Sequence, residues 1–406
     1  MEFIKLPCGI DLLYHWCKSP ISYCGFAINN GTRDELPEEW GMAHFVEHML
    51  FKGTTHRTSQ QVIRQLENIG GQLDAYTEKE ETFVYAVVPN RYTPRAIELL
   101  SDLVFHSTFP QNEIEKERDV IIDEIESYND SPSELIYDDF EAILYPNHPI
   151  GRAILGQSSI LETFTTEQMK AFVDRNYTHD RLLFFYAGRY PLDKLTQLCN
   201  SVMPVADTHN KQQRQTRQKP TAAHKVEKEL IKSTSQAHCM IGYEALPLGH
   251  EQRFTLALLN NILGGPMMSS RFNMAIREKK ALAYTVESST TAYSDTGLWS
   301  VYWGCDHSDV TRTSQLITKE INQLCETPLS AVMLSRAKRQ LLGQLLIASQ
   351  NMENNILSMA KVALHQKINP ETINTEEHIK QITSNDVLNL AQQIFNPNHI
   401  VKLLYV

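Results

Sequence analysis

Short β-rich segments in the first half of the chain predict β-strands. In two of them, Gln72–Thr77 and Thr82–Val88, apolar and polar residues alternate, as they do when side chains point alternately to the two faces of a strand. Longer segments with apolar residues three or four positions apart predict helices over Met42–Phe51, Ser59–Ile69, 92–145 and 165–176. A charged turn at Glu78–Glu81 joins the fourth predicted strand to the fifth. The predicted strands are Glu2–Lys5, Asp11–His15, Ile21–Asn29, Gln72–Thr77, Thr82–Val88 and Leu182–Ala187.

The second half of the chain repeats this order of elements. Helical patterns cover 251–263 and a long stretch, 308–396. Strands are predicted at Lys225–Glu229, Gln236–Tyr243, 283–291, 297–304 and Ile400–Val406. Because strands and helices do not alternate strictly, the pattern favours an α+β fold: two similar domains, each a mainly antiparallel sheet with helices packed on one face.

Between the two halves lies a polar and basic stretch, 205–225, with few large apolar residues. Such a composition is typical of an exposed linker. The sequence therefore predicts one domain at 1–204 and a second domain at 226–406, each of ordinary domain size.

Composition narrows the functional classes. The 406 residues are 42% hydrophobic and 21% charged, as in a globular protein. The net charge of −10, without a basic cluster, argues against binding to nucleic acid or to an anionic membrane surface. No apolar run approaches the roughly 20 residues of a membrane span, and the N-terminal sequence resembles neither a signal peptide nor a transit peptide, so we expect a cytoplasmic protein. The seven cysteines lack CxxC spacing, which argues against a disulfide framework and a thiolate zinc site.

The strongest chemical signal is the group His44, Glu47 and His48 within one predicted helix. At about 100° per residue, the three side chains project from one arc of the helix that is roughly 100° wide. Two imidazoles one turn apart suit tetrahedral zinc, and a carboxylate beside them can take a proton from zinc-bound water. The alternative is a helix whose histidines merely cap a core or face solvent.

A catalytic zinc site uses three protein ligands, so a third ligand is expected elsewhere in the chain. Pro110 precedes a helical pattern, Gln111–Asp130, in which Glu117 and Glu124 lie seven residues apart and therefore on nearly the same face. Glu124 is a suitable third ligand, and Glu117 is a suitable carboxylate behind the ligands that orients them or relays protons. Other glutamates share this helix, and a solvated acidic face is the usual explanation of such a run.

These residues resemble a known family. His-x-x-Glu-His is the inverted zinc motif of the inverzincins. The flanking segments 41–43 (Gly-Met-Ala) and 51–54 (Phe-Lys-Gly-Thr) resemble the pitrilysin/insulinase family, especially its half-length branch that includes the mitochondrial processing peptidase. In that family the third ligand lies about 76 residues beyond the second histidine, in a Glu-Arg-x-Val-Ile-x-x-Glu sequence. Residues 117–124 match this sequence and place its last glutamate at Glu124.

The resemblance extends to a segment that pairs with the substrate backbone in the family. Residues 70–77, Gly-Gly-Gln-Leu-Asp-Ala-Tyr-Thr, are similar to an edge strand whose free N–H and C=O groups bind an extended peptide. The family usually has Asn at position 74, and an ionised Asp has no side-chain donor, so one peptide contact is expected to differ. The substrate-binding residues that the resemblance implies are Gly71, Leu73, Asp74, Ala75 and Thr77.

In the second half, segment 277–284 resembles the segment that carries the Arg/Tyr pair of the family. The resemblance implies that Arg277 and Tyr284 hold the substrate backbone and stabilise the tetrahedral oxyanion, since both donate hydrogen bonds where negative charge develops. Without the resemblance, Arg277 would be interpreted as a cation at a helix end and Tyr284 as an ordinary strand residue.

The resemblance implies a zinc metalloendopeptidase that binds one Zn²⁺ per chain and hydrolyses peptides or unfolded segments, with Glu47 activating the zinc-bound water. The family encloses its substrate between two halves of a clam shell, and this chain supplies one half. The implied partner is therefore a second copy of the chain, in a homodimer, or a homologous subunit. Two other classes of function are considered: a non-catalytic scaffold or partner subunit of a processing-peptidase-like complex, and a peptide-binding module with a structural zinc.

Overall fold

The computed structural model describes residues 1–205 and 216–406, and the chain forms two compact units. Each unit contains most of one half of the sequence. The first unit comprises Met1–Glu126, Arg152–Arg217 and Ser349–Ile373, and the second comprises Ser127–Gly151, Gln218–Ala348 and Asn374–Val406.

Each half of the sequence contributes one segment to the unit that is formed mainly by the other half. Residues 127–151 belong to the second unit, and residues 349–373 belong to the first. The packed units therefore differ in these two segments from the predicted domains 1–204 and 226–406. Residues 206–215 of the predicted linker lie outside the described residues.

The first unit is built on a six-stranded sheet with the strand order β1-β2-β6-β3-β5-β4. Neighbouring strands are antiparallel except β2 and β6, which are parallel. Among the described strands, β4 pairs with β5 alone, so β4 is an edge strand. Each strand agrees with a predicted strand to within one residue: β1 (Glu2–Lys5), β2 (Asp11–Trp16), β3 (Ile21–Ile28), β4 (Gln72–Thr77), β5 (Thr82–Pro89) and β6 (Leu182–Gly188).

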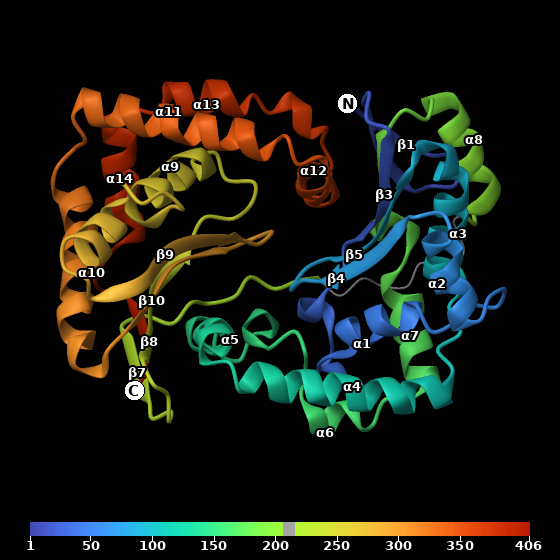
Figure 1. The fold of residues 1–406 in the computed structure, drawn as a ribbon, viewed down its shortest axis with the longest axis horizontal. Helices are drawn as coiled ribbons and strands as arrows, with labels where there is room; N and C mark the ends of the chain where they lie inside the picture. Colours follow the sequence, from blue (N-terminus) through green and yellow to red (C-terminus); the bar gives the residue numbers. More distant parts are fainter. Residues whose placement is uncertain (206–215) are drawn as a thin grey trace. The chain divides into compact units, whose positions relative to one another are not determined.

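Helices cover both faces of this sheet. Most of them pack on one face, whereas α12 lies on the other, as Figure 1 shows. Ile356, Ala360 and Leu364 of α12 are spaced four residues apart and pack against apolar side chains such as Phe185. Burial on both faces explains why β6 is apolar at nearly every position. The helices of this unit are α1 (Met42–Leu50), α2 (Ser59–Glu67), α3 (Thr93–His106), most of α4 (Gln111–Asn129), α6 (Ser158–Leu161), α7 (Thr166–Asn176), α8 (Leu192–Val202) and α12 (Met352–Gln366).

The predicted helical stretch 92–145 is divided into three helices, α3, α4 and α5. Pro110 immediately precedes α4, and Pro132 occupies the first turn of α5. Proline suits the beginning of a helix but not its interior, because it lacks an N–H group and clashes with the preceding turn. Phe109 adopts a positive φ of 50°, which turns the chain between α3 and α4. These breaks give α4 its own direction and separate it from α3.

The second unit is built on a five-stranded sheet with the order β7-β11-β8-β10-β9. Only β7 and β11 are parallel. Strand by strand, this order corresponds to β2-β6-β3-β5-β4 of the first sheet, so the predicted repeat of elements is confirmed in the topology and β9 takes the edge position of β4. The strands are β7 (Val226–Leu230), β8 (Ala237–Ala245), β9 (Ala283–Ala292), β10 (Gly297–Cys305) and β11 (Val401–Tyr405).

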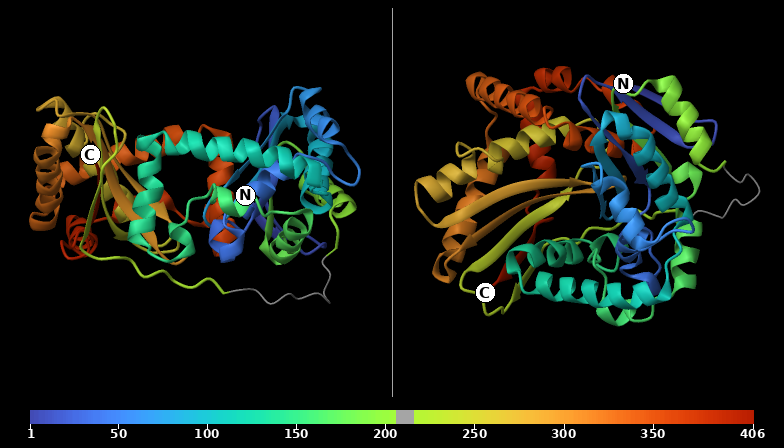
Figure 2. Two further views of the ribbon diagram at one scale, coloured as in Figure 1. Left: turned by 90° about the horizontal axis from the view of Figure 1, so that it is seen from below. Right: turned by 45° about the vertical axis from the view of Figure 1, so that its right-hand side comes forward.

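The exchanged helix α5 covers one face of this second sheet. Ile136, Phe140 and Leu144, again four residues apart, pack against Met240 and Tyr302. Figure 2 shows α5, in teal, on the opposite side of the sheet from α10. The helices of this unit are α5 (Pro132–Leu144), α9 (Arg253–Gly264), α10 (Val310–Glu326), α11 (Ala331–Ala348), α13 (Thr375–Gln381) and α14 (Ser384–Ile394).

The α+β prediction of two similar, mainly antiparallel sheets is confirmed. Helices cover both faces of each sheet rather than one face, because α12 packs on the second face of the first sheet and α5 on that of the second. The stretch 308–396, like 92–145, consists of several helices, and α12 from its middle packs on the first sheet. Within residues 1–205 and 216–406, no helix is both long enough and apolar enough to cross a membrane.

Candidate metal centre

Helix α1 carries the His-x-x-Glu-His motif and begins in an unusual way. Gly41 precedes it with φ 99°, a left-handed conformation that favours glycine, and offers no side chain to cap the helix. The buried carboxylate of Glu35 takes that role, since it accepts hydrogen bonds from the N–H groups of Gly41 (3.0 Å) and Ala43 (2.8 Å). The direction of the helix that carries both histidines is therefore anchored from outside the helix.

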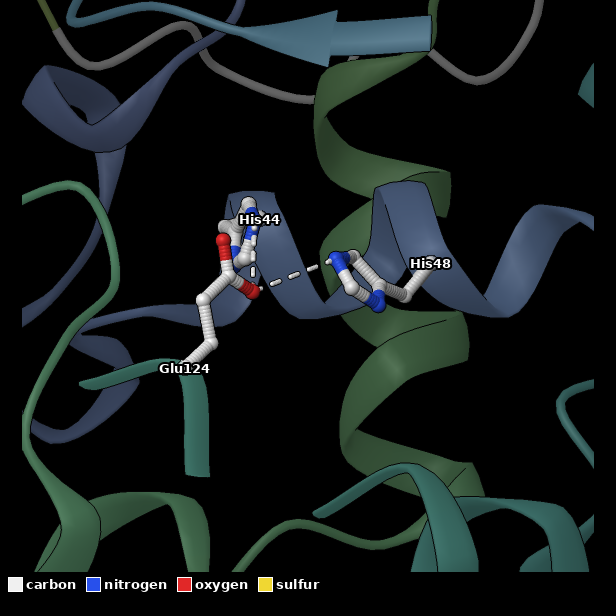
Figure 3. A group of neighbouring side chains, drawn as sticks. All are labelled: His44, His48 and Glu124. Carbon is white, nitrogen blue, oxygen red and sulfur yellow. Dashed lines mark ion pairs between the residues drawn. The ribbon is translucent and has the colours of Figure 1, made fainter. Parts of the chain in front are cut away.

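Three side chains from α1 and α4 converge. Oε2 of Glu124 lies 3.9 Å from Nε2 of His44 and 3.8 Å from Nε2 of His48, as Figure 3 shows. Ligand atoms about 2.1 Å from a zinc ion are roughly 3.4 Å apart in a tetrahedron. The observed separations are slightly wider, and two imidazole nitrogens with one carboxylate oxygen form a donor set that suits zinc. The residues present therefore fit a zinc ion with one open coordination position.

The two histidines have different electrostatic environments. Burial, followed by the neighbouring His48, lowers the pKa of His44 to about 3, so its imidazole is neutral and can offer a lone pair. Burial also acts to lower the pKa of His48, but the hydrogen bond with Glu117 and nearby carboxylates outweigh it and raise that pKa. No described side chain hydrogen-bonds the buried Nδ1 of His44. Only His48 is thus oriented by a carboxylate.

Glu117 lies behind His48. Its Oε1 is 3.0 Å from Nδ1 of His48, and its Oε2 forms an ion pair with Lys52. Burial acts to raise the pKa of Glu117, but the bonds from His48 and Lys52 outweigh burial and lower it, which keeps the carboxylate ionised. With Nδ1 engaged, Nε2 of His48 is the nitrogen that faces Glu124.

The edge strand β4 holds Glu47 next to His44, His48 and Glu124. The hydroxyl of Thr77 donates a hydrogen bond to Oε2 of Glu47 over 2.5 Å, and both residues are buried. Burial raises the pKa of Glu47, against the lowering effect of the Thr77 bond. A pocket of about 570 Å³ opens beside Glu47 and His48, and apolar side chains such as Phe51 and Leu73 contribute to its walls. The carboxylate therefore faces a space that a substrate can enter.

The predicted substrate strand lies along this pocket. Gly71, Leu73, Asp74 and Ala75 line it, and Thr77 ends the strand at Glu47. An edge strand leaves every second N–H and C=O group unpaired. In the register of β4 with β5, the unpaired backbone groups belong to Leu73, Ala75 and Thr77.

The side chain of Asp74 binds one of these unpaired backbone groups, the N–H of Ala75. Its Oδ1 accepts a hydrogen bond from the N–H of Ala75 over 2.8 Å. The hydroxyl of Tyr85 lies 3.3 Å from Oδ2 of Asp74 and 2.9 Å from Oε1 of Glu353, and it donates to one of the two. The side chain at this position therefore competes for a donor that an extended peptide would otherwise use.

Arg277 and Tyr284 belong to the second unit, where they contact each other. The guanidinium carbon of Arg277 lies 5.3 Å from the centroid of the Tyr284 ring, a cation–π distance. Tyr284 lies on the edge strand β9 and is 81% exposed. Arg277 lies in a π-helical turn, Asn273–Glu278, rather than at an ordinary helix end. Such turns are rare and occur frequently at functional sites.

The structure thus brings the sequence-predicted residues together in two groups, one in each unit. Sequence reasoning missed two residues of the first group, Lys52 and Glu35. Lys52 carries a usable signal, because it follows His48 by four residues, the spacing at which side chains share a face wherever a helical turn continues. Glu35 carries none, since its contact with α1 depends on the path of the loop that precedes the helix.

Two family models match the chain. The one described as insulinase (peptidase family M16) matches residues 13–158, and the one described as peptidase M16 inactive domain matches residues 163–341. The uncharacterized zinc protease YmxG of Bacillus subtilis is 31% identical over 383 residues, which cover 94% of this chain and 92% of that protein. The chain belongs to the insulinase family, peptidase family M16. The family resemblance predicted from the sequence is therefore confirmed.

Other members of the insulinase family match over a similar span. The mitochondrial-processing peptidase subunit beta of Neurospora crassa is 29% identical over 388 residues, which cover 92% of this chain and 80% of that protein. Among solved structures, a protease from Helicobacter pylori has the same fold, with a TM-score of 0.92, 17% sequence identity and coverage of 100% of this chain and 99% of that one.

Proposed function

We propose that the chain is a zinc-dependent metalloendopeptidase that hydrolyses peptides or unfolded segments. The observation that carries the proposal is the convergence of His44, His48 and Glu124 beside the buried carboxylate of Glu47. Membership of the insulinase family and the names of relatives, which include a zinc protease and a processing-peptidase subunit, support a zinc-peptidase function.

In this mechanism His44, His48 and Glu124 hold one zinc ion per chain. When bound, the zinc ion supplies Lewis-acid chemistry, polarising the scissile carbonyl and making a water molecule more acidic. Glu47 is the general base. Because Thr77 holds its Oε2, Oε1 is the atom that takes the proton of the attacking water and later delivers it to the leaving amine. The raised pKa of the buried carboxyl suits it to both steps.

The proposed substrate is an extended peptide. It would add as a further strand to the open side of β4, where backbone groups of Leu73, Ala75 and Thr77 provide binding that depends little on side-chain sequence. The pocket beside Glu47 would take one substrate side chain, and the apolar walls at Phe51 and Leu73 favour an apolar one.

We propose a homodimer as the active assembly, with the substrate enclosed between two chains. Each zinc site would then use Arg277 and Tyr284 from the other copy to hold the substrate and stabilise the oxyanion. The competing assembly pairs the chain with a homologous subunit, and one relative is itself named as a subunit. The cytoplasmic location stays a prediction from the sequence.

The test of the function is Glu47→Gln, compared with Glu115→Gln on the exposed surface of α4. The amide has nearly the same shape as the carboxylate but cannot accept the proton. We expect hydrolysis of an unstructured peptide to fall by roughly 10²–10⁴-fold with bound zinc unchanged. The Glu115→Gln control should behave as wild type. Peptide hydrolysis at the wild-type rate by Glu47→Gln would rule out this mechanism, and a wild-type chain without hydrolysis in any assembly would favour the non-catalytic scaffold.

A further inference from the structure

A second polar pocket in the first unit lies outside the proposed zinc site. It has a volume of about 500 Å³ and is lined by residues of α2, of α3, of the end of α8 and of the segment that joins α1 to α2. Two histidines contribute to its walls, His56 from the joining segment and His106 from the last position of α3. The charged residues of its walls are Arg57, Glu98 and Asp102.

Asp102 is a buried residue of the pocket wall and orients His56. Its Oδ1 lies 2.6 Å from Nδ1 of His56, and its Oδ2 accepts hydrogen bonds from Thr54 (2.8 Å) and Arg57 (2.5 Å). Burial acts to raise the pKa of Asp102, but the bonds from His56, Thr54 and Arg57 outweigh burial and lower it. An ionised carboxylate bonded to Nδ1 favours the tautomer of a neutral histidine that carries its proton on Nδ1 and its lone pair on Nε2. This is the state in which a histidine binds a metal ion.

His106 lies against His56 in an arrangement that resembles the histidine pair of the proposed zinc site. The rings of His56 and His106 have centroids 5.0 Å apart and planes at 85°, and those of His44 and His48 are 4.6 Å apart at 65°. In both pairs, one histidine has a carboxylate on its Nδ1. A third pair, His224 and His399 in the second unit, has rings 4.4 Å apart that lie closer to parallel, at 34°. Among the described residues, no carboxylate hydrogen-bonds to either of these two rings.

The charge around His56 and His106 also suits a cation. Arg57 contributes one positive charge, but both its terminal nitrogens are engaged by the carboxylates of Glu98 and Asp102, so the three groups together carry a net negative charge. His106 is the last residue of α3, and the carboxyl end of a helix dipole attracts cations.

We propose that His56 and His106 form a second binding site for a divalent transition ion of the Zn²⁺ class, with Asp102 as the residue that orients His56. Two imidazoles would hold the ion and water would complete its coordination, which makes the site weaker than one with three protein ligands. A bound ion would join the segment after α1 to the end of α3 and stabilise that contact. The site does not depend on the proposed peptidase function, because it shares no residue with it.

The experiment measures zinc bound per chain after dialysis against increasing free Zn²⁺. His56→Asn is the central variant, because the amide of asparagine can still donate to Asp102 while the Nε2 ligand is lost. His106→Gln removes the other ligand. His224→Asn, in the third histidine pair, is the matched control. Circular dichroism of each variant establishes that it is folded.

We expect wild type to bind a second equivalent of zinc at higher free Zn²⁺ than the first, with a further rise in the thermal unfolding midpoint as that site fills. His56→Asn and His106→Gln should each lose the second equivalent and its stabilisation while keeping the first, and His224→Asn should keep both. The proposal is wrong if wild type binds a single equivalent, if the second equivalent survives both substitutions, or if it is lost in His224→Asn instead.

Discussion

The hydroxyl of Thr77 donates a hydrogen bond to Oε2 of Glu47 over 2.5 Å, and so connects the end of the edge strand β4 to helix α1. The resemblance of the sequence to the insulinase family implies a substrate-binding role for Thr77, but its side chain has a different use. It holds one oxygen of the proposed general base, on the strand that is proposed to receive the substrate. The hydrogen bond therefore links the proposed substrate strand directly to the proposed base.

This link predicts the effect of Thr77→Val, which keeps the shape of the side chain and removes the hydroxyl. A hydrogen bond to a charged group is worth about 1.5–3 kcal/mol, so we expect kcat to fall by roughly tenfold or more. Bound zinc should be unchanged, because no ligand is altered. Thr77→Ser, which keeps the hydroxyl, should recover most of the rate. Equal kcat values for Thr77→Val and wild type would show that Glu47 does not depend on this bond.

Metal retention distinguishes the ligands from the carboxylate behind them. His48→Ala and Glu124→Ala should each lose most of the bound zinc, because each removes a direct ligand. Glu117→Ala should keep part of it, with a loss of roughly 10–100-fold in zinc affinity or activity, since it removes only the group that orients His48. Metal analysis of the purified variants decides this. Full zinc occupancy in Glu124→Ala would place the third ligand elsewhere, with Glu117 the first alternative.

Complementation tests the shared sites of the proposed homodimer. In a mixed dimer of Glu47→Gln and Arg277→Ala chains, one site receives both lesions and the other receives neither. We expect such a dimer, isolated with two affinity tags, to recover about half of the wild-type activity per dimer, because the two-fold assembly has two sites. If each site instead used Arg277 of its own chain, every site would carry one lesion and the mixed dimer would be as inactive as its parents.

The acid stability of the first unit should depend on Glu81, in the turn between β4 and β5. Its carboxylate pairs with Lys361 and His365 of the exchanged helix α12. Burial acts to raise its pKa, but these partners outweigh burial and lower the pKa to about 2. A lowered pKa in the folded state means that the stabilisation is complete above the ordinary value near 4.5 and is lost as the pH falls through about 2.

Glu81→Gln should therefore lower the free energy of unfolding at pH 7 by up to about 3 kcal/mol, since each pKa unit corresponds to 1.36 kcal/mol. The difference from wild type should shrink between pH 4.5 and pH 2. Urea unfolding at several pH values measures it. Glu376→Gln, which breaks an exposed pair with Lys380, is the control and should have a small effect at every pH. A pH-independent difference for Glu81→Gln would point to lost packing instead of lost charge.

Much of the fold is local enough to be predicted from the sequence. Short β-rich segments placed every strand of the first sheet to within one residue, and two of these segments, Gln72–Thr77 and Thr82–Val88, alternate between apolar and polar residues. Pro110 marked the start of α4 in the sequence, whereas the start of α5 at Pro132 was not predicted. The exchange of α5 and α12 has no sequence signal, since an apolar stripe shows that a helix must be covered but not which sheet covers it.

In the candidate site, too, some features could be predicted from the sequence and others depended on the tertiary structure. The sequence by itself determined that His44, Glu47 and His48 share one arc of a helix, because that follows from the helical period over four residues. Only the tertiary structure decided that Glu124 reaches Nε2 of both histidines and that Thr77 reaches Glu47, since these contacts depend on how α4 and β4 pack on α1. The Asp102–His56 contact belongs to this second kind. Such distances are set by the volumes of the buried side chains between the elements, and no short-range pattern in the sequence reports them.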